Sequence, residues 1–201
     1  MSPRQSASMP VASRKPARRR RSAGFNLIEL MVVIAIGAIL TGIGVSSYRY
    51  VTYSNRVSTE VNSLLGDLML ARSEAIKQGV NVYVCPLATG PTCATNSSSW
   101  QNGWMVFADV DGSTDYNTGD VLIRVQKAFT KATDTFTSDN SVTNVKFNRE
   151  GFAVGLPSSS SVNYITITLH TTPTNSQWTR CVQVTSYGGL TTEHSGKGGC
   201  S

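Results

Sequence analysis

Residues 25–45 read FNLIELMVVIAIGAILTGIGV, an apolar run with three polar residues, Asn26, Glu29 and Thr41. As a helix this run would be about 30 Å long, which matches the hydrocarbon core of a bilayer. The sequence therefore predicts a transmembrane helix over residues 25–45.

The segment before this run carries the excess positive charge of the chain. Its bases are Arg4, Arg14, Lys15, Arg18, Arg19, Arg20 and Arg21, and residues 1–24 contain no acid. The whole chain has 18 Lys and Arg against 12 Asp and Glu, so without these seven bases the charge is close to balanced. Bases beside a membrane helix stay in the cytoplasm, which directs the rest of the chain outward. The balanced remainder argues against nucleic-acid binding through bulk charge.

Glu29 is unusual in a membrane-spanning helix. A lone carboxylate there costs roughly 2.5–3.5 kcal/mol or more, and no Lys, Arg or His lies between Phe25 and Tyr48. Cleavage between Gly24 and Phe25 would create a new α-amino group. A neighbouring subunit displaced by about one helical turn would place this amine beside Glu29. We therefore expect Glu29 to make an assembly contact; the alternative is a plain membrane anchor that happens to carry a glutamate.

The residues around this junction, Gly24-Phe25-Asn26-Leu27-Ile28-Glu29-Leu30, resemble the processing motif of type IV pilins and type II secretion pseudopilins. The resemblance implies that a prepilin peptidase cleaves after Gly24, that Phe25 is N-methylated and that Glu29 is the assembly carboxylate. It implies a single-pass protein of the inner membrane, with a cytoplasmic N-terminus and a periplasmic C-terminal domain. Assembly-platform proteins and other pilins or pseudopilins would then take it into a filament. The leader starts at Met1, or at Met9 if translation begins there.

The helical pattern continues beyond the membrane segment. Apolar residues recur every three or four positions, and charged residues fall on the other faces. The apolar stripe is Val57, Val61, Leu64, Leu68, Ala71 and Ala75, and the charged residues are Arg56, Glu60, Asp67, Arg72 and Lys77. Gly79 is a plausible C-terminal stop. We expect one helix over residues 25–79, about 80 Å long, whose outer half buries the stripe against a sheet.

After Gly79 the apolar period changes to two, which is typical of strands. The expected strands are Val80–Cys85, Gly103–Ala108, Val121–Lys127, Val142–Phe147, Tyr164–Leu169 and Trp178–Thr185. The fold class is therefore α+β: a long N-terminal helix, transmembrane in its first half, packed against a C-terminal antiparallel β-sheet domain. This divides the chain into a cleaved leader (1–24), the helix (25–79) and a β-rich periplasmic domain (80–201).

A second set of motifs is similar to the FimT/GspH group of minor pilins and pseudopilins. It comprises Leu64, Leu68 and Ala71-Arg72-Ser73-Glu74-Ala75-Ile76, then Val82-Tyr83-Val84-Cys85-Pro86, Cys93 and Trp100-x-x-Gly103-Trp104-x-Val106-Phe107-x-Asp109. The similarity covers residues 24 to about 125 well and the last third only in its β character and Cys181. It implies a non-enzymatic subunit of a type IV pilus or of a type II secretion pseudopilus, and the Cys and Trp pattern tilts towards the pilus.

Four cysteines beyond the membrane segment predict disulfides, because that side of the membrane is oxidising. Three pairings are possible. We favour Cys85–Cys93 and Cys181–Cys200, which close the shortest loops; the second would fasten the Gly-rich tail 188–199 to the last strand. A zinc site is disfavoured, since there is no C-x-x-C and the histidines are His170 and His194 alone. The sequence shows no catalytic constellation and implies no cofactor.

Oxygen side chains alternate along residues 109–120, which read DVDGSTDYNTGD. Calcium loops use this alternation, but the EF-hand pattern also needs Gly at its sixth position and Glu at its twelfth. The sequence therefore favours a plain turn between two strands, with a calcium loop as the alternative.

DNA capture for natural transformation is the rival function. Some members of the group carry a Gly-Arg-x-Arg motif in the C-terminal loop, whereas residues 188–197 read GGLTTEHSGK here. Near this loop the candidates for phosphate contacts are Arg180 and Lys197, offset by Glu193. A patch of other bases is the alternative, although scattered bases usually form a solvated face: Arg124, Lys127, Lys131, Lys146 and Arg149.

Overall fold

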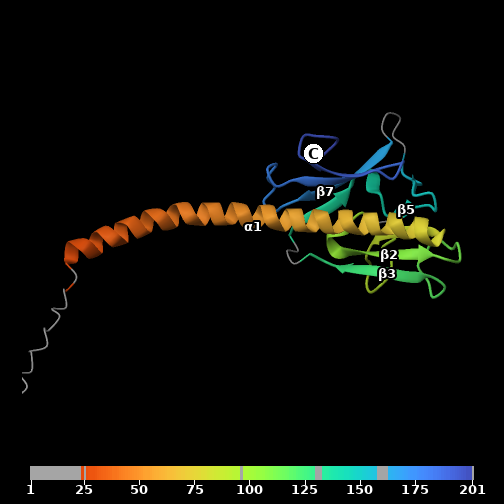
Figure 1. The fold of residues 1–201 in the computed structure, drawn as a ribbon, viewed down its shortest axis with the longest axis horizontal. Coiled ribbons are helices and arrows are strands. Elements are labelled where there is room, and N and C mark those ends of the chain that lie inside the picture. The colour runs from red at the N-terminus through yellow and green to blue at the C-terminus, as the bar shows by residue number, and fades with distance from the viewer. Residues whose placement is uncertain (1–23, 25, 96, 130–132, 158–162, 201) are drawn as a thin grey trace, which may run out of the picture. The chain divides into compact units, whose positions relative to one another are not determined.

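A computed structural model describes residues 24, 26–95, 97–129, 133–157 and 163–200; the leader residues 1–23 and Phe25 lie outside this description. One long helix, α1 (Leu27–Gln78), is followed by two antiparallel sheets (Figure 1). Internal contacts divide the chain into two units, residues 1–45 and 46–201. The division falls within α1, because the second half of this helix packs in the core of the second unit.

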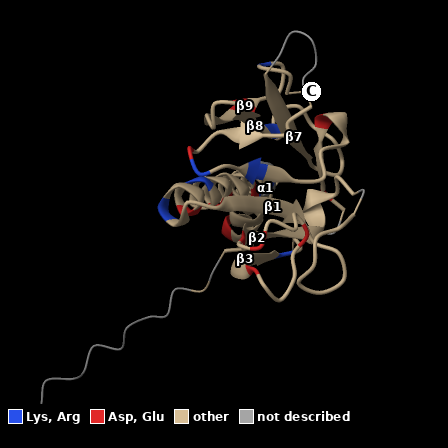
Figure 2. Cartoon of the chain, turned by 90° about the vertical axis from the view of Figure 1, so that its right-hand side faces the viewer, with Lys and Arg blue, Asp and Glu red and all other residues tan. Residues whose placement is uncertain are grey.

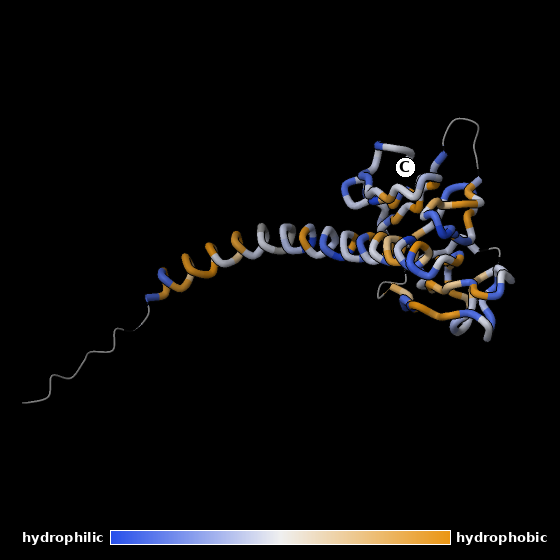
Figure 3. The backbone as a smooth tube through the Cα atoms, turned by 45° about the vertical axis from the view of Figure 1, so that its right-hand side comes forward, coloured by the Kyte–Doolittle hydropathy of each residue, from blue (hydrophilic) through white to orange (hydrophobic). Residues whose placement is uncertain are grey.

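In the first unit α1 is apolar and exposed. Its large apolar side chains between Leu27 and Leu40 have exposed fractions of 51–74%. An 18-residue window reaches a mean hydropathy of 2.4 with none of it buried, so the helix is long and apolar enough to cross a membrane (Figure 3). A helix that is apolar on all sides belongs in lipid or among other apolar helices.

In the second unit α1 buries the stripe expected from its period. Val57, Val61, Leu64, Leu68, Ala71 and Ala75 are at most 2% exposed. They join one core with apolar residues from both sheets. The helix ends at Gln78, and Gly79 follows with φ +71° while its N–H donates to the Ala75 carbonyl at 3.0 Å. Gly79 is therefore the stop that the sequence predicted.

The strands form two sheets rather than one. The first has the order β3-β2-β1-β5-β6, and the second has the order β4-β7-β8-β9. The strands of the first sheet are β1 (Asn81–Pro86), β2 (Gly103–Asp109), β3 (Val121–Lys127), β5 (Val145–Phe147) and β6 (Ala153–Val154). Those of the second are β4 (Thr135–Ser138), β7 (Tyr164–His170), β8 (Arg180–Thr185) and β9 (Leu190–His194). Two short 3-10 turns, η1 (Trp100–Asn102) and η2 (Asp139–Ser141), precede β2 and β5.

All six expected strands are present, but two of them start two or three residues later than expected. The strand expected from Trp178 begins at Arg180, and the strand expected from Val142 begins at Val145, after the η2 turn and its C-cap Val142. Asn140 and Ser141 have φ of 50° and 52°, and the Val142 N–H turns back to the Asp139 carbonyl at 3.3 Å. This left-handed turn is incompatible with an extended strand.

Three strands were missed: β4, β6 and β9. The first two are only 4 and 2 residues long, too short to show a period. The third lies within the segment that was expected to be a tail. Gly188 has φ +76° and its N–H donates to the Thr185 carbonyl at 2.9 Å, so the glycines form a hairpin turn between β8 and β9.

Both disulfides have the pairing that the sequence favoured. Cys85 at the end of β1 is joined to Cys93, and Cys181 in β8 is joined to Cys200. The second bond holds the C-terminal turn after β9 against β8.

Candidate functional site

The candidate assembly site lies where α1 begins. The N–H groups of Glu29 and Leu30 donate to the Asn26 carbonyl at 3.0 and 3.2 Å, so Glu29 lies in the first helical turn. A negative side chain is favourable there, because unpaired N–H groups make that end of a helix partly positive. Gly24, the residue before the predicted cleavage point, precedes the helix and is exposed.

Glu29 has no ion-pair partner among the residues of this unit that the structure describes. It is exposed, and no Lys, Arg or His occurs from residue 24 to 45. Among the described residues no base forms an ion pair with it. The geometry therefore presents a single carboxylate on an apolar helix, available to a cation from outside the chain.

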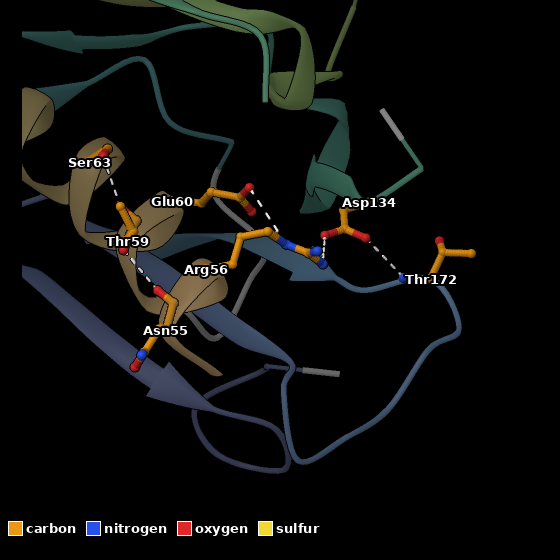
Figure 4. A network of polar contacts seen from close by, with 7 residues as sticks. All are labelled: Asn55, Arg56, Thr59, Glu60, Ser63, Asp134 and Thr172. Atoms are coloured by element: carbon orange, nitrogen blue, oxygen red, sulfur yellow. Dashed lines mark hydrogen bonds and ion pairs between the residues drawn. The ribbon is translucent and has the colours of Figure 1, made fainter. Parts of the chain in front are cut away.

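A second polar group attaches α1 to the β-strands (Figure 4). Arg56 Nη2 donates to Asp134 Oδ2 in a short ion pair, and the Thr172 N–H donates to Asp134 Oδ1 at 3.1 Å. Arg56 Nε lies 4.0 Å from Glu60 Oε1. The Asp134 side chain is fully buried. One carboxylate thus links the helix to the segments before β4 and after β7.

Glu60 has an unusual environment in this network. Burial raises the pKa of its carboxyl to about 7; the Arg56 charge opposes this shift and the Asp134 charge adds to it. Its Oε2 is buried and has no hydrogen-bond partner among the described residues. The ionised form of Glu60 is therefore poorly accommodated in the folded protein.

Replacing Glu60 with glutamine should stabilise the protein increasingly as the pH rises. Below a pH of about 4.5 Glu60 is protonated in both folded and unfolded chains and costs nothing. Above this pH the unfolded chain ionises first, and the penalty on folding grows until the pH passes the folded pKa of about 7. We expect the advantage of Glu60→Gln to grow by up to about 3 kcal/mol between pH 5 and 8.

Thermal unfolding of the full chain in detergent, followed by tryptophan fluorescence, would measure this difference. Glu74→Gln is the matched control. Hydrogen bonds from Gln78 and Lys77 lower the pKa of Glu74, so that carboxyl stays ionised throughout this range. An equal effect of Glu60→Gln at pH 5 and pH 8 would contradict the prediction.

Asp67 forms a third buried contact of the helix. Its Oδ2 accepts the Trp104 Nε1–H at 2.8 Å, and its Oδ1 lies 3.0 Å from Arg124 Nε. Burial raises the pKa of Asp67, while the Trp104 hydrogen bond and the Arg124 charge oppose this shift.

The helix faces that carry Glu60 and Asp67 are covered as well as the apolar stripe. The two residues are 8% and 2% exposed. The helical period placed both residues away from the stripe, but Trp104 and Arg124 contact Asp67 there, and Asp134 contacts Arg56, the neighbour of Glu60 on the helix. Trp104 is 37 residues from Asp67, and Asp134 is 78 residues from Arg56. A local sequence pattern therefore cannot predict these contacts.

The two candidates for DNA contact lie near one another. Arg180 in β8 is the cross-strand partner of His194, and the Lys197 N–H donates to the His194 carbonyl at 3.1 Å. Arg180 Nη1 already donates to the carbonyls of Gln177 and Thr179. The Lys and Arg residues of the second unit, residues 46–201, are spread over several elements and do not gather along one of them (Figure 2). DNA capture therefore stays a prediction from the sequence, with no observation that favours it.

A family model described as Type II transport protein GspH matches residues 60–188. The chain belongs to this family. A second model, the prokaryotic N-terminal methylation motif, matches residues 19–45, which include the Gly24–Phe25 junction. The GspH-family chain is thus a structural, non-enzymatic pilin-like subunit. Membership and motif together imply processing by a prepilin peptidase, assembly with other pilins and anchoring in the inner membrane before assembly.

Two solved structures resemble the GspH-family chain, both of the type IV minor pilin FimU of Pseudomonas aeruginosa. The first has a TM-score of 0.53 and 18% identity, covering 69% of this chain and 89% of FimU. The second, another crystal form, has a TM-score of 0.51 and 17% identity, covering 68% and 91%. The likeness shows the pilin fold, a long N-terminal helix packed against antiparallel sheets. No curated protein matches the chain.

Proposed function

We propose that this GspH-family chain is a minor pseudopilin that is cleaved after Gly24, N-methylated at Phe25 and assembled through Glu29. The observation that carries the proposal is Glu29. It is the only charged residue from 24 to 45, it lies in the first turn of an exposed apolar helix, and it follows the junction matched by the methylation motif.

Before assembly, residues 25–45 would hold the precursor in the inner membrane. The arginine-rich leader stays in the cytoplasm by the positive-inside rule, and residues 46–201 lie in the periplasm. Two disulfides in the second unit fit an oxidising compartment.

During assembly, cleavage frees the Phe25 amine, which is the cation that Glu29 lacks within its own helix. Pairing of this amine with Glu29 of a neighbouring subunit neutralises both charges in an apolar setting. The exposed apolar side chains of residues 27–40 then pack against other subunits as the chain leaves the bilayer. Prepilin peptidase, other pseudopilins and assembly-platform proteins are the partners in this scheme.

The type II secretion pseudopilus is the machine that the family match supports. The Cys and Trp pattern of the sequence instead favoured the pilus. FimU is named as a pilus subunit, but at 18% identity its likeness shows the fold alone. We therefore expect deletion of the gene to impair exoprotein release and to leave twitching motility intact. The reverse phenotype would assign the chain to a pilus.

The mature N-terminus tests the processing step directly. Mass spectrometry of the membrane-resident protein should find N-methylated Phe25 as its first residue. Gly24→Ala is expected to leave the leader attached and to keep the protein out of filaments. Uncut Gly24→Ala protein within filaments would overturn the proposal.

A further inference from the structure

The loop between β2 and β3 brings together three carboxylates that the assembly scheme does not use. One carboxylate oxygen from each of Asp109, Asp111 and Asp120 lies within 4.8 Å of the other two. Among the described residues no Lys or Arg pairs with any of them; Arg149, which borders the same depression, pairs with Glu150 at 3.0 Å. N–H groups of the loop donate hydrogen bonds to Asp111 and Asp120, but among the described residues no positive charge offsets the mutual repulsion of the three carboxylates.

Asp109 supplies an independent sign of a missing ligand. Its side chain is deeply buried, at 4% exposed. Its Oδ1 accepts the Gly112 N–H at 2.8 Å, but its Oδ2 is buried without a hydrogen-bond partner among the described residues. A buried carboxylate oxygen without a donor is costly, and a bound water or ion is the usual explanation. Since this carboxylate approaches those of Asp111 and Asp120, a cation satisfies it better than a neutral water does.

The rest of the loop adds further oxygens. The Asn117 Nδ2–H₂ group donates to three of them, Asp111 Oδ2 at 2.8 Å, Ser113 Oγ at 2.7 Å and the Asp115 carbonyl at 3.3 Å. These oxygens are therefore already hydrogen-bonded, and only their second lone pairs are open to an ion. Thr114 has φ +71°, the left-handed conformation. It stands at the sixth position of the loop, where an EF-hand turns sharply at a glycine. The missing glycine, which argued against a calcium loop, is thus no obstacle to the turn.

We propose that the loop of residues 109–120 binds one Ca²⁺ through the carboxylates of Asp109, Asp111 and Asp120. The candidate ligands are all oxygens, which suits Ca²⁺ or Mg²⁺ and not Zn²⁺. Irregular placement on a loop favours Ca²⁺, because Mg²⁺ requires a near-ideal octahedron. Asp120 at the twelfth position is shorter than the bidentate glutamate of an EF-hand, so we expect a Kd of about 10⁻⁴–10⁻³ M.

Calorimetry on the full processed chain in detergent, stripped of metal with EDTA and dialysed, tests the proposal. CaCl₂ should titrate one saturable site per chain, and MgCl₂ should bind at least about tenfold more weakly. Calcium at about ten times its Kd should raise the midpoint of thermal unfolding by about 3–5 °C. The absence of saturable heat, together with an unchanged midpoint, would overturn the proposal.

Two variants of the same loop separate a built site from simple charge attraction. Asp111→Asn removes an exposed ligand and should weaken Ca²⁺ binding at least about tenfold. Its unfolding midpoint in EDTA should be slightly lower, because the ionised Asp111 accepts hydrogen bonds from Ser113 and Asn117, but unfolding should stay cooperative, which shows that folding is intact. Asp115→Asn removes the same charge from a side chain outside the cluster and should change the Kd less than about twofold. Equal weakening by both variants, or no weakening by Asp111→Asn, would overturn the proposal.

Discussion

Substituting Glu29 with alanine is expected to lower incorporation of this chain into filaments by about 100-fold or more, while the protein stays in the membrane. The substitution removes the carboxylate and leaves the Phe25 amine of a neighbouring subunit without its partner. Leaving one member of a buried ion pair alone costs about 3–5 kcal/mol, and each 1.4 kcal/mol is a factor of ten. Membrane insertion itself should improve, because the alanine variant has a wholly apolar helix start.

Immunoblots of sheared filaments and of the membrane fraction would measure the two pools. Glu29→Gln keeps the shape of the side chain without its charge, and it should behave like the alanine variant. Thr41→Ala is the matched control, because Thr41 Oγ1 is hydrogen-bonded only within its own helix, to the carbonyls of Gly37 and Ala38. Assembly of Glu29→Gln at the level of the unmodified chain would contradict the proposed pairing of Glu29 with the Phe25 amine.

Asp134→Ala is expected to lower the free energy of unfolding by about 3–5 kcal/mol, the usual cost of removing one partner of a buried ion pair. The substitution leaves the Arg56 guanidinium without its main acceptor and the Thr172 N–H without a partner. Glu60 replaces Asp134 poorly, because it lies 4.0 Å from Arg56 Nε and because burial, the largest cause of its raised pKa, remains when Asp134 is removed.

Denaturant unfolding of the full chain in detergent, followed by tryptophan fluorescence, would give this free energy. The free energy of unfolding of Asp134→Asn should lie between those of the unmodified protein and of Asp134→Ala, since the amide oxygen can still accept the Thr172 N–H. Glu150→Ala is the control for an exposed ion pair: Arg149 and Glu150 side chains are 73% and 49% exposed, so the loss should stay within about 1 kcal/mol. A loss below about 1 kcal/mol for Asp134→Ala would show that the network does not hold the helix.

The helix was readable from local sequence, and so was the motif on which the proposed assembly site rests. The motif around Gly24, Phe25 and Glu29 spans a few consecutive residues, and its chemistry needs no folding of the chain beyond one helical turn. The stripe from Val57 to Ala75 repeats with the helical period, so its burial followed from sequence spacing alone. Cysteine pairing across short loops was readable for the same reason.

Contacts between distant residues became visible only in the folded chain. The sequence implied one sheet, but the division into two sheets depends on which strand edges pair. Asp67 is buried beneath Trp104, and Arg56 beside Glu60 pairs with Asp134; both partners reach the helix from other elements.

The loop of residues 109–120 lies between these cases. The alternating oxygen side chains were visible in the sequence, but the sequence does not show which of these side chains are buried. Folding buries the Asp109 carboxylate and leaves its Oδ2 without a hydrogen-bond partner among the described residues. For this reason we interpret the loop as a candidate ion site, whereas the sequence favoured a plain turn. Periodicity and short motifs act between near neighbours, so sequence carries them directly; burial and charge pairing are sums over the whole fold, so only the tertiary structure decides them.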